Sequence, residues 1–289
     1  MKDALPQTIY LKDYKVPPFL IETTDLVFDL GEQQTCVTSS LAVRRNPASA
    51  EQSGSLELNS KGDVQLQWVE IDGQRLNDSD YTLSDNMLTL SNLPTSCVIT
   101  TEVRIQPQLN TSMMGLYRSR TMYCTQCEAE GFRRITYFPD RPDIMSIFTV
   151  KIVADKASYP ILLSNGNAIS RSDLEGGRHS ITWHDPFKKP SHLFALVAGT
   201  LAVVEDSFTT VSGREIPLQI FVEEKDLDKC AHAMLSLKKS MRWDEDVYGR
   251  EYDLDIFMIV AVDDFNMGAM ENKGLNIFNT SAVLANPKT

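Results

Sequence analysis

The sequence predicts a mainly β domain over residues 1–200, built as a large antiparallel sheet or sandwich, followed by the first part of an α/β domain over residues 201–289. Two observations support this prediction. Between about residues 19 and 200, short runs of β-branched and aromatic residues alternate with turn signals. After residue 200 the pattern changes to a long helical segment and then a continuous apolar run, which is typical of a buried strand.

Strands in the first part are predicted wherever such a run stands between turn residues. Asp72-Gly73 follows the first of these runs, and Ser84-Asp85-Asn86 separates the second from the third. The predicted strands are 64–71, 81–83, 87–90, 98–105, 147–153 and 181–184.

The second part begins with a predicted strand at 218–222. A helix should follow, with Asp226 or Asp228 as its N-cap and its end near Gly249. The apolar run 254–262 is the next predicted strand. Some three strands and one helix make a poor closed core, so we expect this chain alone to associate or aggregate.

Composition excludes several classes of partner. The 289 residues carry a formal net charge of −11, which argues against nucleic acid and against anionic membranes. The longest apolar runs, such as 193–204, are shorter than the roughly 20 residues of a membrane span. The first residues have no apolar core of a secretory signal, so we expect a cytoplasmic protein.

Cysteine and histidine spacing gives no metal site. Cys124 and Cys127 form a C-x-x-C, but no second ligand pair stands at matching spacing, and we expect two reduced cysteines in or near a core. No pair among the four histidines has the H-E-x-x-H spacing; they are His179, His184, His192 and His232.

Two acidic segments remain as candidates for chemistry. In 124–134, the residue pattern by itself predicts a solvated ion pair between Glu130 and Arg133 or Arg134. In 265–274 (FNMGAMENKG), the pattern by itself favours Glu271 as an exposed acid of a turn, because Asn272-Lys273-Gly274 is a turn sequence.

The exact order of residues in these two segments indicates a protein family more specifically than the spacing of their acids does. G-A-M-E-N stands at 268–272 within 263–278 (DDFNMGAMENKGLNIF), and T-Q-C-E stands at 125–128 within the long block 115–142. With both elements in this order, the sequence resembles the zinc-dependent gluzincin aminopeptidase family, most closely its bacterial aminopeptidase N branch. The resemblance extends from about Tyr10 to Ala285.

The resemblance implies a saddle-like N-terminal β domain followed by a thermolysin-like catalytic domain. It implies one zinc ion in the full-length enzyme, held by H-E-x-x-H and a downstream Glu. Neither these ligands nor the catalytic base lies within residues 1–289, and we expect the H-E-x-x-H helix shortly after Thr289. This chain would then be an N-terminal portion that is inactive alone and has no catalytic or metal-binding residue.

By the same resemblance, Glu271 and Glu128 are carboxylates that bind the free α-ammonium group of a peptide. A charge-assisted hydrogen bond of this kind is roughly twice as strong as a neutral one. The backbone of Gly268 and Ala269 would bond to the substrate as an added strand does. Met267 would cushion the first side-chain pocket, although plain core packing is its alternative. The substrate-binding residues so implied are Gln126, Glu128, Met267, Gly268, Ala269, Met270, Glu271 and Asn272.

The full-length protein is therefore expected to hydrolyse N-terminal residues from peptides with a free N-terminus, as a monomer. A non-catalytic β-rich interaction module on the same scaffold is the alternative, and the intact G-A-M-E-N disfavours it. An epoxide-hydrolysing relative is disfavoured by Glu128, where that branch carries Gln.

Overall fold

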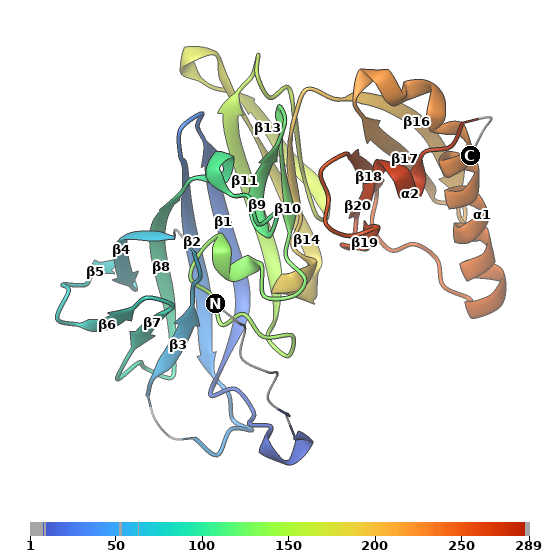
Figure 1. Ribbon diagram of the computed structural model, residues 1–289. Coiled ribbons are helices and arrows are strands. Elements are labelled where there is room, and N and C mark those ends of the chain that lie inside the picture. Colours follow the sequence, from blue (N-terminus) through green and yellow to red (C-terminus); the bar gives the residue numbers. More distant parts are fainter. Residues whose placement is uncertain (1–7, 9, 52–53, 63, 287–289) are drawn as a thin grey trace.

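The computed structural model describes residues 8, 10–51, 54–62 and 64–286, and strands dominate it (Figure 1). The first part is organised around an eight-stranded sheet. From edge to edge its strands are β13 (Asn167–Asp173), β14 (Arg178–Pro190), β11 (Met145–Asp155), β1 (Phe19–Leu30), β2 (Thr35–Arg45), β8 (Ser96–Ile105), β4 (Gln65–Ile71) and β5 (Gln74–Arg75).

The sheet is antiparallel except for one pair. β1 and β11 are parallel, with Thr23 opposite Ile147, so the sheet is mixed. These strands are far apart in the sequence, and parallel strands need such a long connection where antiparallel ones need only a hairpin. The six strands predicted for this part are all present: 87–90 has its predicted bounds, and the other five differ at one or both ends.

A bulge in β1 changes which of its residues face the core. Phe19 and Ile21 are buried before the register shift between Ile21 and Thr23, whereas Leu26 and Phe28 are buried after it. One extra residue reverses the alternation of the two faces. Simple alternation along this segment is therefore not a reliable guide to its buried side.

Two smaller sheets complete the first part. The four-stranded one contains β12 (Ile161–Ser164), β15 (Leu196–Gly199), β10 (Met122–Gln126) and β9 (Gly115–Ser119). The three-stranded one contains β3 (Leu56–Asn59), β7 (Met87–Leu90) and β6 (Tyr81–Ser84). Four buried rings pack together in the core, with centroids 5.0–6.4 Å apart: Phe132, Phe138, Phe148 and Phe194.

The second part is a five-stranded sheet with a long helix, α1 (Ala231–Tyr248), and a short one, α2 (Thr280–Val283). This is more than the three strands expected. The strands, in spatial order, are β16 (Ala202–Thr209), β17 (Glu215–Val222), β18 (Phe257–Val262), β20 (Leu275–Asn279) and β19 (Ala269–Met270). β15 ends and β16 begins on either side of the predicted domain boundary after residue 200, which stays a prediction.

Both faces of this sheet are covered. Ile259 and Ala261 of β18 pack with Leu237 and Met241 of α1, whereas Met258 and Val260 join the core of the first part. Alternate residues of one strand point to opposite faces, so the two parts share a buried interface. Figure 1 shows the sheet between α1 and the first part.

The predicted start of the long helix is wrong. A 3-10 helix spans Glu224–Lys229, and α1 begins only at Ala231, with no side-chain cap. Asp226 is buried and its carboxylate bonds to Lys225 and Lys229 instead of to backbone N–H groups. The predicted end near Gly249 is confirmed, because Gly249 adopts φ 61°, the left-handed conformation that glycine tolerates best.

Cys124 and Cys127 are both free and fully buried, which confirms the prediction for them. Burial raises the pKa of the Cys124 thiol to about 12. Within the described ranges, no helix combines the length and apolarity needed to cross a bilayer.

Candidate substrate-anchoring site

The segment that carries Glu271 forms the edge of the five-stranded sheet. A loop over residues 263–268 leaves β18 and leads into β19, after which a turn at 273–274 returns the chain as β20. Met270 and Asn272 are buried, with exposed fractions of 2% and 1%, whereas Glu271 between them is exposed. This strand-like alternation presents the Glu271 carboxylate to solvent.

The open side of β19 can receive another strand. Asn279 N–H donates to the Gly268 carbonyl at 3.0 Å, and Met270 pairs with Ile277, so Ala269 lies between two bonded positions. In an antiparallel ladder the N–H and C=O of such an intervening residue point away from the partner strand. Ala269 therefore offers its backbone groups outward, while the Gly268 carbonyl is already engaged.

The turn behind Glu271 is held by the first part of the chain. Asn165 Nδ2 donates to the Lys273 carbonyl at 2.9 Å. The Lys273 ammonium lies 3.7 Å from the centroid of the Phe187 ring and 2.7 Å from Asp253 Oδ2. Backbone and side chain of Lys273 are thus both fixed, which defines the path of the chain directly after Glu271.

Two glycines of this segment should respond differently to alanine. Gly274 has φ +83°, and a Cβ there would lie 2.9 Å from Leu254 and 3.2 Å from the Gly166 nitrogen, whereas a Cβ on Gly268 would meet nothing within 4 Å. We expect Gly274→Ala to lower the free energy of unfolding by about 1–3 kcal/mol, and Gly268→Ala by less than about 0.5 kcal/mol. Thermal unfolding of both variants measures this, and equal losses would contradict it.

The second segment ends strand β10. Gln126 is 1% exposed, its Nε2 donates to the Glu128 carbonyl at 2.8 Å, and its Oε1 has no partner in the described part of the chain. Glu128 is exposed in the turn that follows. The predicted ion pair of Glu130 is present with Arg133, at 3.4 Å and with the Glu130 side chain 61% exposed.

Both segments are bonded to the β9–β10 hairpin. Gln126 pairs with Gly115 across it. Tyr117 Oη donates to the Asp264 carbonyl at 2.7 Å, and Ser119 Oγ donates to Asp264 Oδ2 at 2.8 Å. Sequence reasoning missed these contacts, and the local signal was the acidic pair Asp263-Asp264 directly after a buried strand.

Met267 is 42% exposed, so its alternative, plain core packing, is wrong. The exposure of Glu271 fits both an exposed turn acid and a group that meets a ligand.

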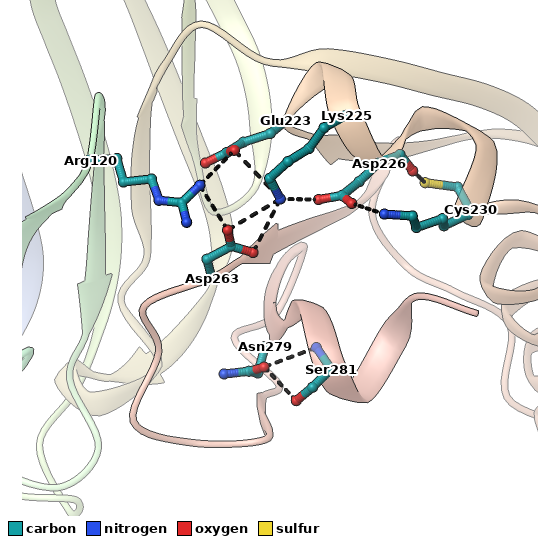
Figure 2. Close-up of polar contacts among 9 residues, drawn as sticks. Arg120, Glu223, Lys225, Asp226, Cys230, Asp263, Asn279 and Ser281 are labelled. Carbon is teal, nitrogen blue, oxygen red and sulfur yellow. Dashed lines mark hydrogen bonds and ion pairs between the residues drawn. The ribbon is translucent and has the colours of Figure 1, made fainter. Parts of the chain in front are cut away.

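Charged residues tie the hairpin to the second part (Figure 2). Arg120, in the β9–β10 turn, lies 3.0 Å from Asp263 and 3.2 Å from Glu223, and Lys225 also reaches both acids. The hydrogen bond from Lys225 to Asp226 raises the pKa of Lys225 above its ordinary value. Burial by itself would raise the pKa of Asp226, but its lysine partners outweigh burial and lower it.

No group of three His, Cys, Asp or Glu residues that could hold a metal ion occurs among the described residues. His179 Nε2 lies 2.8 Å from the Tyr159 carbonyl, and His184 Nδ1 lies 3.2 Å from Thr149 Oγ1. These residues do not fit the zinc site that the family resemblance implies.

The fold matches about a third of a solved aminopeptidase. The crystal structure of Legionella pneumophila aminopeptidase A in complex with aspartic acid matches with a TM-score of 0.92 and 36% identity, over 96% of this chain and 33% of that one. The profile of the Peptidase M1 N-terminal domain matches residues 33–193, and that of the Peptidase family M1 domain matches residues 232–289. The chain belongs to the peptidase M1 family.

Curated relatives agree over the whole length of the chain. Aminopeptidase N of Caulobacter vibrioides is 53% identical over 289 residues, which are 100% of this chain and 33% of that protein. Aminopeptidase N of Escherichia coli is 52% identical over 98% of this chain and 32% of its own length. The chain thus spans about a third of the length of these relatives.

Proposed function

We propose that this chain supplies the amine-recognising part of an aminopeptidase, in which Glu271 and Glu128 bind the free α-ammonium group of a peptide. The observation that carries the proposal is the attachment of both segments to one hairpin. The loop before Glu271 is bonded to Tyr117 and Ser119, and the strand before Glu128 pairs with the same β9. Two exposed carboxylates on a common support suit a cation that must be held at a fixed place.

The two acids would select peptides by charge. An ammonium group forms charge-assisted hydrogen bonds to carboxylates, whereas an internal amide offers only a neutral N–H. Placing the ammonium fixes the distance to the first peptide bond, and such positioning can supply several kcal/mol of the rate enhancement. The outward backbone groups of Ala269 would bond the substrate as an added strand, and Gln126 and Met267 would line the first side-chain pocket.

The resemblance to M1 peptidases implies one zinc ion in the full-length enzyme. On the basis of this resemblance, we propose that residues outside these 289 bind the zinc ion. We also propose that the full-length enzyme is monomeric and cytoplasmic.

Two assays test this function. The full-length protein should release the first residue of an alanyl peptide and leave its N-acetylated form intact, because acetylation removes the ammonium charge. The 289-residue chain alone should release nothing and should retain no stoichiometric zinc after dialysis. Cleavage of the acetylated peptide at a similar rate would contradict the amine anchor, and turnover by the chain alone would contradict its inactivity.

A further inference from the structure

The loop before the edge strand is fixed by a buried hydroxyl from the other part of the molecule. Tyr117 is 1% exposed, and its Oη donates to the Asp264 carbonyl at 2.7 Å across 147 residues of sequence. Ser119 Oγ donates to Asp264 Oδ2 at 2.8 Å. One loop residue is thus held through both its backbone and its side chain.

A second attachment lies two residues further along this loop. Asn266 Nδ2 donates to the Ser112 carbonyl at 2.9 Å. The loop that contains Ser112 is itself ordered, because Asn110 Nδ2 donates to the carbonyls of Met114 and Leu116. Residues 264 and 266 are therefore both attached to β9 or to the loop that leads into it, immediately before the chain reaches Gly268 and β19.

The other strand of the hairpin leads to Glu128. Cys124 lies opposite Tyr117, and Gln126 lies opposite Gly115. The Gln126 side chain then bonds to the Glu128 carbonyl at 2.8 Å. The side-chain hydrogen bonds of Gln126 and Tyr117, together with the paired strands of the hairpin, thus connect the backbone of Glu128 to the loop that leads to Glu271.

We infer that Tyr117 is a positioning residue, whose hydroxyl sets the place of Glu271 relative to Glu128 and so tunes amine recognition. The inference rests on the proposed function. It assigns to Tyr117 no contact with substrate, since its hydroxyl is used by the Asp264 carbonyl.

Tyr117→Phe removes only the hydroxyl, and the same hairpin offers a matched control. Tyr123 is also buried, and its Oη donates to a backbone carbonyl at 2.9 Å, but that carbonyl belongs to Gly31, within the first part. Tyr123→Phe therefore removes an equivalent hydrogen bond that does not reach the Asp264 loop.

The readout is the amine preference, defined as the inhibition constant of phenylpropionate divided by that of phenylalanine. Both are measured on the full-length enzyme, by competition against a chromogenic aminoacyl substrate. We expect Tyr117→Phe to lower the amine preference about 3- to 10-fold, the effect of one hydrogen bond. Tyr123→Phe should change it by less than about twofold. If the two hydroxyls had a merely structural role, both variants would lower the amine preference by the same factor.

Ser119→Ala removes the other hydroxyl that donates to Asp264. It should also lower the amine preference, and it replaces Tyr117→Phe as the test if that variant does not fold. An unchanged preference in the folded variants, or an equal fall in Tyr123→Phe, would overturn the inference. Glu271→Ala separates this from the proposed function: if that variant keeps the wild-type preference, the amine anchor itself is wrong.

Discussion

Replacing Glu271 by alanine in the full-length enzyme should lower kcat/KM for peptides with a free N-terminus by about ten- to a hundredfold. The reason is the loss of a hydrogen bond to a charged group, worth about 1.5–3 kcal/mol. Glu271 is exposed, and its neighbours Met270 and Asn272 carry the packing of this strand, so its truncation should leave the fold intact. Steady-state kinetics together with thermal unfolding measure both expectations.

A charge-matched pair of variants controls for surface effects. Glu271→Gln keeps the shape of the side chain and removes its charge, so it should retain more efficiency than Glu271→Ala and less than the wild type. Glu130→Gln makes the same change at an exposed acid that pairs with Arg133, at 3.4 Å, and should change kcat/KM by less than about twofold. Full efficiency of Glu271→Ala on free-amine substrates would show that the anchor is assigned to the wrong residue.

Lys189→Met should lower the free energy of unfolding by about 3–5 kcal/mol, the usual cost of breaking a buried ion pair. Lys189 Nζ lies 3.2 Å from Asp185 Oδ2 and 4.1 Å from the centroid of the Phe148 ring, and the two charged side chains are 2% and 1% exposed. Removing the lysine leaves the buried Asp185 carboxylate without its ion-pair partner. Urea denaturation followed by tryptophan fluorescence measures the loss.

Two further variants identify the cause. Lys156→Met breaks an ion pair of 2.7 Å with Asp173 whose side chains are 55% and 74% exposed, and should cost less than about 1 kcal/mol. The double variant Asp185→Asn, Lys189→Met removes both buried charges and should recover most of the stability lost by Lys189→Met. If the double variant is as unstable as the single one, lost packing and not the unpaired charge is the cause.

The same pair predicts a dependence of stability on pH. Burial lowers the pKa of Lys189 to about 8, from its ordinary value of 10.5, although Asp185 opposes this shift and nearby Lys273 adds to it. Between these two values the unfolded chain binds more protons than the folded one, so the free energy of unfolding contributed by Lys189 rises with pH. The stability contributed by Lys189 is fully present above pH 10.5 and is lost as the pH falls to about 8. The stability difference between wild type and the double variant should follow this course and be flat from pH 6 to 8, as urea denaturation at each pH would measure.

Much of the secondary structure could be predicted because burial leaves a local pattern in the sequence. The apolar residues of 98–105 and 147–153 alternate or cluster as they must for a sheet with a buried face, and β8 and β11 are found there. Gly249 marked the end of α1 because its conformation depends on one residue. The predicted start of α1 was wrong for the opposite reason. Asp226 is a good N-cap in isolation, but here it is buried and its carboxylate bonds to Lys225 and Lys229.

The candidate site divides in the same way. The two signatures identify Glu128 and Glu271 without any structure, because the residues of each signature are contiguous in the chain. Nothing in either segment predicts that Tyr117 bonds to Asp264, or that Asn165 holds Lys273. These partners are separated by more than 100 residues, and no local pattern records which distant residue fills a given place.

The sequence by itself determined the mainly β first part, the α/β second part and the family signatures. Only the tertiary structure decided that β1 and β11 are parallel, that the bulge in β1 reverses its buried face, and that one hairpin supports both acidic segments. The physical reason is that periodicity reports the burial of each residue along its own strand or helix. The relative placement of two segments depends instead on the packing and hydrogen bonds between them, which form only when the whole core is assembled.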